Sequence, residues 1–292
     1  MRTEKEMFSL FDRIAAEDDR IRVVTLEASR VNPHITPDIW QDYDITFLVT
    51  DMEPYLRSDD WLSVFGDLVF LQKPEAMALF PPDFPEGWFS YLMLFRDGTK
   101  IDLTLITLDR AEEYFSSDPL IKVILDKDGI APELPEPTDD PFRTDCPPGE
   151  YVTDCANEFY FSCTYAQRAL FREEIQFVRH VFETRLHPEL LRMLTYLAGS
   201  RGGFPVNTGK YGRWLNRYLS AEEQGMLSSA YDLHSLEASQ QALDTAMELF
   251  RGSLAEVCGT LGCEDPGYHE IIMDYLGTLK DIRDAENPDK QK

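Results

Sequence analysis

The stretch Thr25–Asp51, TLEASRVNPHITPDIWQDYDITFLVTD, holds the end of one apolar run, a polar loop and the whole of a second apolar run. The first run covers residues 21–27 and the second covers residues 43–49. Both are rich in β-branched and aromatic residues, which is the composition of strands. The stretch therefore predicts two strands joined by a turn and a loop.

Aspartates stand at the start of the second run and recur in a later one. Asp42 and Asp44 flank a tyrosine, and residues two apart in a strand point to the same side, so their carboxylates are expected to converge. Residues 100–106, KIDLTLI, are another strand candidate, in which apolar residues alternate with Asp102 and Thr104. We therefore expect three carboxylates to meet on one face of a sheet.

Such a cluster needs a positive counter-charge. Unpaired carboxylates repel one another and resist ionisation when they are partly buried. Oxygen ligands of this kind suit Mg²⁺, which binds them together with substrate phosphates. Two ions about 4 Å apart could activate an attacking oxygen and neutralise a leaving pyrophosphate. The alternative is a solvated sheet edge, where an Asp-x-Asp at the start of a strand is also common.

The tripeptide Ala28-Ser29-Arg30 follows the first predicted strand. It offers backbone N–H groups, a hydroxyl and a guanidinium to a phosphate. Alone it is weak evidence, because a serine after a strand is often only a helix cap. The order of the motifs along the chain strengthens the phosphate-binding interpretation. The tripeptide is followed by a loop, by the strand with Asp-x-Asp and then by a strand with a third aspartate.

The rest of residues 1–130 mixes strand and helix patterns, which predicts a small α+β domain on a mixed sheet. Further strands are expected at 67–72 and 91–96, and Asp97-Gly98 predicts a hairpin into 100–106. Helices are expected before the first strand, near residues 55–65 and at 108–115.

The pattern changes at residues 131–150, APELPEPTDDPFRTDCPPGE, where six prolines prevent regular structure and indicate an acidic linker. Residues 151–292 then predict a helical bundle. Asp154 or Asn157 is the expected cap of its first helix. The other expected helices cover residues 188–198, 210–219, 237–258 and 268–281.

The net charge of −25 indicates the class of partner. A chain this acidic repels a phosphate backbone, so we expect no nucleic-acid partner and instead metal ions or a polycationic small molecule. Five cysteines without a CxxC pair indicate free thiols in a reducing cytoplasm. No segment approaches the roughly 20 apolar residues of a membrane span, so no membrane partner is expected. We expect a monomer.

Longer motifs narrow these possibilities to a family. The chain resembles the aminoglycoside 6-adenylyltransferases, which modify streptomycin, within the polymerase-β-like nucleotidyltransferases. The resemblance covers most of the chain from Met1 to about Leu219. It is carried by RIRVVTLEASRVN, WQDYDITFLVTD, DDWLSVFGD, QKPEAMALFPP, FSYLMLFRDGTKIDLTLI, LIKVILDKD, NEFYFSCTYAQRALFREEI, HPELLRMLTY and GKYGRWLNRYLS.

The resemblance implies transfer of AMP from ATP to a streptomycin hydroxyl, with release of pyrophosphate and ATP held between the two domains. It implies that residues 1–130 are an N-terminal nucleotidyltransferase domain and that residues 151–292 are the helical substrate-binding domain. It also assigns residues by motif position. Asp42 and Asp44 would hold Mg²⁺, and Asp102 would complete the cluster and help to remove the hydroxyl proton. Ser29 would bind the triphosphate, with Arg30 nearby. Lys210 would reach the phosphates from the helical domain; its alternative is a solvated lysine.

Two positions depart from the family pattern. Ala28 stands where the family usually has glycine, and alanine would distort the turn if the position needs a positive φ. Tyr160 and Phe161 stand in a segment where the family tends to have tryptophan, which bears on the identity of the acceptor. For the cationic acceptor we expect contacts from Asp154 and Glu158.

Three functions follow from these observations. The first is a Mg²⁺-dependent adenylyltransferase that acts on streptomycin and so gives antibiotic resistance. The second keeps the mechanism but takes a different aminoglycoside or another cationic acceptor. The third is a non-catalytic relative that binds a cation, which the three retained aspartates argue against.

Overall fold

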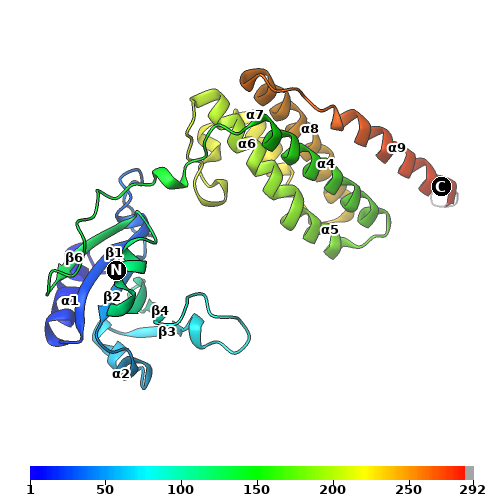
Figure 1. The fold of residues 1–292 in the computed structure, drawn as a ribbon. Helices are drawn as coiled ribbons and strands as arrows, with labels where there is room; N and C mark the ends of the chain where they lie inside the picture. Colours follow the sequence, from blue (N-terminus) through cyan, green and yellow to red (C-terminus); the bar gives the residue numbers. More distant parts are fainter. Residues whose placement is uncertain (287–292) are drawn as a thin grey trace. The chain divides into compact units, whose positions relative to one another are not determined.

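A computed structural model describes residues 1–286 of the chain. The chain divides into two compact units, Met1–Pro141 and a second that begins at Phe142, and the division falls inside the proline-rich segment. The first unit carries the strands and the second is helical (Figure 1). Each unit is described by itself below.

The first unit is built on a six-stranded sheet with the order β3-β4-β5-β2-β1-β6. Its strands are β1 (Ile21–Glu27), β2 (Tyr43–Val49), β3 (Leu68–Gln72), β4 (Trp88–Phe95), β5 (Lys100–Thr107) and β6 (Ile121–Asp126). The β2–β5 pair is parallel and the other pairs are antiparallel, which confirms the predicted mixed sheet. Strands β4 and β5 form the predicted hairpin, whose turn has Gly98 at φ +84°.

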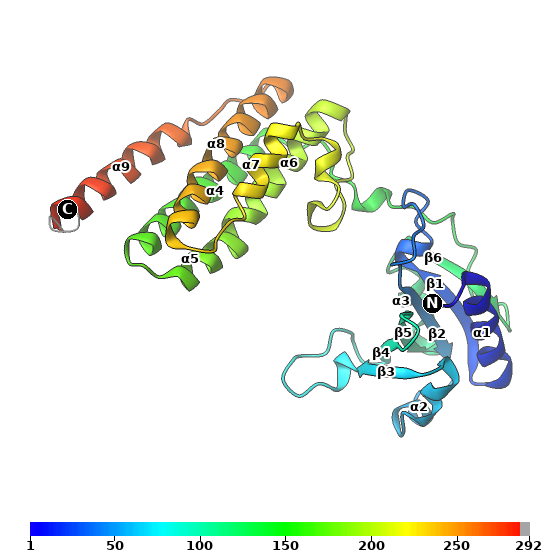
Figure 2. The same cartoon turned by 180° about the vertical axis from the view of Figure 1, so that it is seen from behind.

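Helix α1 (Glu4–Glu17) covers one face of this sheet (Figure 2). Its apolar residues, such as Phe11, pack with Tyr43 and Phe47 of β2, because alternate residues of β2 point to that face. The short helix α2 (Glu53–Leu56) and the 3₁₀ turn Asp60–Phe65 add to the same core.

The opposite face is covered differently. Helix α3 (Ala111–Phe115) packs on the part of this face that carries Val23, Leu48 and Ile106. The other positions of the face carry the polar residues of β2 and β5, Asp44 and Asp102 among them. The sheet thus separates an apolar side under α1 from a side where carboxylates can gather.

The second unit consists of helices around one apolar core (Figure 1). They are α4 (Gly149–Phe171), α5 (Ile175–Val181), α6 (His187–Gly202), α7 (Ala221–Ser229), α8 (Leu236–Leu261) and α9 (Tyr268–Glu286). A π-helical turn, Phe182–Leu186, joins α5 to α6. Phe159 of α4 stacks on Phe250 of α8 at 4.0 Å between ring centroids, and both are fully buried.

Two sequence predictions about this unit are wrong. Residues 210–219 were expected to be a helix but form two short 3₁₀ turns, Lys210–Gly212 and Leu215–Arg217. Gly209, Tyr211 and Gly212 have φ of +74°, +56° and +71°, which right-handed helix cannot contain. The apolar spacing of the segment resembles a helix, but its backbone is a folded loop.

The cap of the first helix was also misplaced. Helix α4 begins at Gly149, so Asp154 and Asn157 lie within it and neither caps it. The capping position is Pro148, which is extended at ψ 151°. The pair Pro147-Pro148 cannot be part of a helix interior, so the helix starts directly after it.

Two further properties of the described chain are the state of its cysteines and the polarity of its helices. All five cysteines are free thiols. Among residues 1–286, every helix is too short or too polar to cross a bilayer.

Candidate functional site

The three aspartates singled out in the sequence lie together on the sheet. Asp44 of β2 and Asp102 of β5 are register partners in the parallel pair, and Asp42 directly precedes β2. One oxygen of each of the three carboxylates lies within 4.8 Å of the others. The alternation of two neighbouring strands therefore produces the cluster, because both strands place their aspartates on the same face.

Burial and mutual repulsion make this cluster electrostatically costly. Burial first, and then the charges of Asp42, Asp102 and Glu27, raise the pKa of Asp44 to about 7. Burial also raises the pKa of Asp102, against the opposing effect of Lys100. Without a cation, the ionised form of Asp44 is therefore disfavoured.

Lys100 supplies the positive charge that the structure places in the cluster. Its Nζ donates to Oδ2 of Asp42 and to Oδ2 of Asp102, at 2.6 Å in each case. Sequence reasoning missed this residue. The signal was present, because Lys100 stands two residues before Asp102 and so shares its face of the strand.

The ligands fit a divalent cation. All the available ligand atoms are carboxylate oxygens, which Mg²⁺ prefers. Oδ1 of Asp102 is buried and has no hydrogen-bond partner, and no hydrogen bond within residues 1–286 reaches the carboxylate of Asp44. Buried oxygens without partners are unusual in proteins, and coordination to a cation would satisfy them.

The turn after β1 holds Ala28-Ser29-Arg30 as a 3₁₀ turn, and it departs from ordinary backbone geometry. Ala28 has φ +56°, in the left-handed region that favours glycine. The turn nevertheless forms, and the N–H of Ala28 donates to the carbonyl of Leu120 at 3.1 Å. The half-buried Ser29 stands next to it.

Arg30 ties this turn to the aspartate segment. Its guanidinium donates from Nε to the carbonyl of Asp42 and from Nη2 to that of Gln41, both at 2.7 Å. It also lies over the ring of Tyr43, 3.6 Å from the centroid. The side chain of Gln41 donates back to the carbonyl of Ser29 at 3.1 Å. The two segments are therefore held in fixed register.

A buried polar group lies behind the aspartates and was not found from the sequence. Glu27, at the end of β1, accepts hydrogen bonds from Tyr114 Oη at 2.6 Å and Thr25 Oγ1 at 3.3 Å. Thr25 and Tyr114 also contact each other. Burial raises the pKa of Glu27. Thr25 and Glu27 alternate along β1, a pattern that could have indicated a polar sheet face.

The helical unit carries an acidic hollow of about 280 Å³. It is lined by Tyr151, Asp154, Cys155, Glu158, Glu189, Arg192 and Tyr196. Sequence reasoning named Asp154 and Glu158, and helix α4 places them one turn apart on this surface. Glu158 accepts from Arg185 at 3.0 Å, and Arg192 pairs with Glu189 at 2.8 Å. Asp154 is exposed and its carboxylate makes no hydrogen bond or ion pair within residues 1–286, so its charge is available to a ligand.

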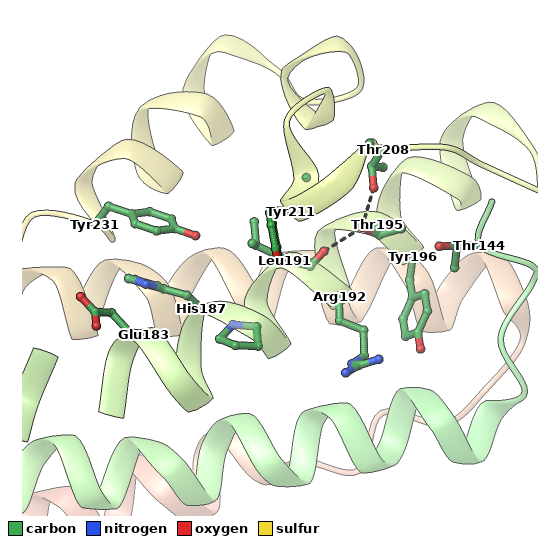
Figure 3. Close-up of a pocket in the computed structure, with 13 residues that line it drawn as sticks. Thr144, Glu183, His187, Leu191, Arg192, Thr195, Tyr196, Thr208, Tyr211 and Tyr231 are labelled. Atoms are coloured by element: carbon green, nitrogen blue, oxygen red, sulfur yellow. Dashed lines mark hydrogen bonds between the residues drawn. The ribbon is translucent and has the colours of Figure 1, made fainter. Parts of the chain in front are cut away.

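A larger pocket of about 660 Å³ lies beside this hollow and shares Arg192 and Tyr196 with it. Tyr231 stacks on the buried His187 at one end, with 3.8 Å between ring centroids, and Thr144 and Tyr196 lie at the other end (Figure 3). Thr195 and Thr208 are joined by a 3.1 Å hydrogen bond in its wall. Sequence reasoning missed this pocket, because it is assembled from segments that are distant along the chain.

Lys210 lies in the loop at the rim of this larger pocket. It is exposed, and its Nζ lies 5.4 Å from the ring centroid of Tyr211, whose side chain is 85% exposed. Gly209 and Tyr211, on either side of Lys210, line the pocket. A Cβ at Gly209 would lie 2.8 Å from Trp214, so glycine is required for the loop to fold in this way.

The two residues that depart from the family pattern lie differently on α4. Tyr160 is 1% exposed and its hydroxyl has no hydrogen-bond partner, whereas Phe161 is 55% exposed. Phe161 makes an edge contact with Tyr165. Of the pair, only Phe161 offers its ring to a ligand.

Comparison with known proteins relates this arrangement to characterised enzymes. Residues 1–279 match the family described as streptomycin adenylyltransferase. An aminoglycoside 6-adenylyltransferase of Campylobacter jejuni is 41% identical over 290 residues, which is 99% of this chain and 100% of the relative. One of Bacillus subtilis (strain 168) is 41% identical over 276 residues, 94% of this chain and 97% of the relative.

The solved structures include a similar protein. The crystal structure of an aminoglycoside 6-adenyltransferase from Bacillus subtilis is 37% identical, covers 96% of this chain and 99% of its own, and superposes with a TM-score of 0.47. The family match and the curated relatives extend over nearly the whole chain. The chain therefore belongs to the streptomycin adenylyltransferase family.

Proposed function

We propose that this chain is a Mg²⁺-dependent enzyme that transfers AMP from ATP to a hydroxyl of streptomycin. Membership of the family makes it an adenylyltransferase with an aminoglycoside acceptor. The choice of streptomycin and the need for Mg²⁺ are the parts proposed here. The observation that best supports the need for Mg²⁺ is the convergence of Asp42, Asp44 and Asp102, with a buried oxygen that lacks a partner. The description of the family supports streptomycin as the acceptor.

The proposed reaction is a displacement at the α-phosphorus of ATP. The acceptor oxygen forms a bond to this phosphorus, the bond to the β-phosphate oxygen breaks, and pyrophosphate leaves with the electron pair. Bound Mg²⁺ would neutralise charge on the phosphates and lower the pKa of the attacking hydroxyl. Asp42, Asp44 and Asp102 would hold it.

A carboxylate of the same cluster would accept the hydroxyl proton. Asp102 is our first candidate, because its buried Oδ1 has no donor in the described chain and can take a proton. Burial raises the pKa of Asp102 and so makes it a better base than an exposed aspartate. In the metal-free chain Lys100 pairs with the other oxygen of Asp102.

The proposed nucleotide contacts come from the turn after β1, and the resemblance to the family adds Lys210. The Ser29 hydroxyl, beside the strained Ala28, would donate to the triphosphate. Arg30 would contribute positive charge near it while holding the backbone of Asp42. Lys210 would contact the phosphates, since its ammonium group is exposed on a loop with a required conformation.

The acceptor would be recognised by acidic side chains of the helical unit. Asp154 and Glu158 face one hollow together with Glu189, and the net charge of −25 attracts a polycation at long range. Tyr196 lines both this hollow and the larger pocket, so one ligand could contact both. We therefore place the cationic groups of streptomycin against Asp154 and Glu158.

Pyrophosphate release from ATP and Mg²⁺ tests this proposal. We expect release that depends on streptomycin, and its loss in Asp42→Asn and Asp102→Asn. The exposed Asp12→Asn of α1 is the matched control and should release pyrophosphate as the unchanged protein does. Release only with another aminoglycoside would contradict the choice of acceptor. Tight streptomycin binding without any release would contradict catalysis.

A further inference from the structure

Lys100 is an unusual neighbour for a set of metal ligands. Its ammonium group lies 2.6 Å from Oδ2 of Asp42 and 2.6 Å from Oδ2 of Asp102, so it bridges two strands of the cluster. Both partner carboxylates are half-buried, at 31% and 23% exposure. An ammonium group with this geometry satisfies the two carboxylates as a small cation would.

The ammonium group of Lys100 and a divalent ion would compete for the same carboxylates. A divalent ion held by the three aspartates would require oxygens of Asp42 and Asp102, and Lys100 occupies one oxygen of each. Two positive charges within contact distance would also repel each other strongly. The ammonium group can leave, because it is carried on a flexible four-carbon stem and is 41% exposed.

Lys100 alone neither balances the charge of the cluster nor satisfies all its oxygens. A single positive charge cannot balance three carboxylates, and neither Asp44 nor Oδ1 of Asp102 receives a hydrogen bond from residues 1–286. A divalent ion supplies one more charge than the ammonium group and can contact all three side chains. Electrostatic attraction therefore favours displacement of the lysine by an incoming divalent ion.

We propose that Lys100 is a built-in counter-ion of the metal site, which stabilises the carboxylates in the metal-free chain and is displaced when a divalent ion binds. Metal binding and the Lys100 pairs are then mutually exclusive. The inference rests on the proposed metal site but adds a competition that membership of the family does not state. A lysine that merely oriented the carboxylates would instead strengthen metal binding.

Titration of the full-length chain with Mn²⁺, followed by calorimetry and by electron paramagnetic resonance, tests this competition without ATP or acceptor. We expect Lys100→Met to bind Mn²⁺ about tenfold more tightly, which corresponds to the loss of two half-exposed ion pairs from the metal-free state. The metal-free variant should also unfold at a lower temperature, and Mn²⁺ should raise its unfolding temperature more than that of the unchanged protein.

Three variants control the measurement. Lys100→Gln is a second neutral variant and should behave as Lys100→Met does. Lys100→Arg keeps the positive charge and should leave the Mn²⁺ affinity close to that of the unchanged protein. Lys73→Met removes the same charge from a pair with Asp59 outside the cluster, and the affinity should not change. Equal or weaker Mn²⁺ binding by both neutral variants would overturn the inference.

These measurements distinguish failure of the role of Lys100 from failure of the proposed function. Unchanged Mn²⁺ affinity in the neutral variants, with AMP transfer intact in the unchanged protein, overturns only the role of Lys100. Absence of Mn²⁺ binding from the unchanged protein and from every variant would overturn the metal site, and with it both proposals.

Discussion

At the scale of single residues, the site depends on side chains whose ionised forms are destabilised by burial and by neighbouring charges. Asp44 has the clearest shift, because burial and neighbouring carboxylates raise its pKa to about 7. Lys100 offsets part of the repulsion through Asp42 and Asp102 and makes no bond to Asp44. The metal-free chain therefore keeps a carboxylate that is unstable in its ionised form, which is what a cation site requires.

Replacing Asp44 with asparagine should reveal this cost as a dependence of stability on pH. The native pKa of Asp44 lies above its ordinary value of 3.8, so its contribution to stability is complete below pH 4 and is lost as the pH rises through 7. In EDTA, Asp44→Asn should raise the unfolding temperature, with a gain that grows from pH 5 to pH 7 and then levels off. The corresponding increase in the free energy of unfolding should reach on the order of a few kcal/mol, since each pKa unit corresponds to about 1.4 kcal/mol.

Thermal unfolding of both proteins at pH 5 to 8 checks this expectation. The exposed Asp12→Asn serves as the control for the removal of one negative charge from the same unit. A difference between Asp44→Asn and the unchanged protein that is the same at pH 5 and pH 8 would contradict it.

At the scale of elements, two tight turns present the proposed nucleotide-binding residues. The turn after β1 has Ala28 at φ +56°, and the loop before Trp214 has positive φ at Gly209, Tyr211 and Gly212. Such backbone is strained for residues other than glycine and is concentrated at functional sites. In both turns the strain places a polar side chain, Ser29 or Lys210, at a surface.

Ala28→Gly should relax the first of these turns. An L-residue in the left-handed region costs about 1 to 2 kcal/mol, while glycine loses about 0.5 to 1 kcal/mol through the entropy of the unfolded chain. The net expectation is a small increase in the free energy of unfolding, about 0.5 kcal/mol. Ala16→Gly, at an exposed position of helix α1 in the same unit, should instead lower it. Chemical denaturation measures the free energy of unfolding of both variants. If Ala28→Gly lowers it as much as Ala16→Gly does, the backbone at Ala28 is not strained.

Particular elements show which features the sequence could predict. Strands β1, β2 and β5, and the shared face of Asp42 and Asp44, follow from alternation along single strands, which is local. The meeting with Asp102 also needs the pairing of β2 with β5. The hairpin at Asp97-Gly98 also follows from a local signal. Strand β6 was not predicted, because Ile121–Asp126 lies at the sheet edge, is mostly only partly buried and is paired by β1 alone.

The features that were missed depend on contacts between distant segments. Residues 210–219 have helical apolar spacing, but packing of Gly209 against Trp214 fixes a different backbone. Arg30 was expected near phosphate, and its bonds to the carbonyls of Gln41 and Asp42 require the folded loop. The bridge made by Lys100 requires the pairing of β2 with β5.

At the scale of the whole molecule, acidity is the property that suits the proposed cationic acceptor. The chain carries 53 acidic and 28 basic residues, and most of the acids are solvated surface. The proposed acceptor hollow concentrates Asp154, Glu158 and Glu189, with only Glu158 and Glu189 paired to arginines. Long-range attraction and local contact therefore act on the same cationic ligand.

Asp154→Asn should weaken streptomycin binding without affecting the nucleotide. The KM for streptomycin should rise about two- to fivefold, the range of an exposed ion pair, with the KM for ATP unchanged. The effect should shrink as NaCl is raised, because salt screens exposed charges. Asp274→Asn, an equal charge change on α9, should leave both KM values unchanged. Steady-state kinetics at two salt concentrations decides, and equal effects of the two variants would contradict a specific contact.

The most direct measurement is transfer of label from α-³²P-ATP to streptomycin by the full-length chain in Mg²⁺. We predict labelled streptomycin from the unchanged protein, and none from Asp44→Asn, which removes a proposed metal ligand while keeping its size. Full labelling by Asp44→Asn, or no labelled product with any aminoglycoside, would contradict the claim that the three aspartates hold the ion required for AMP transfer.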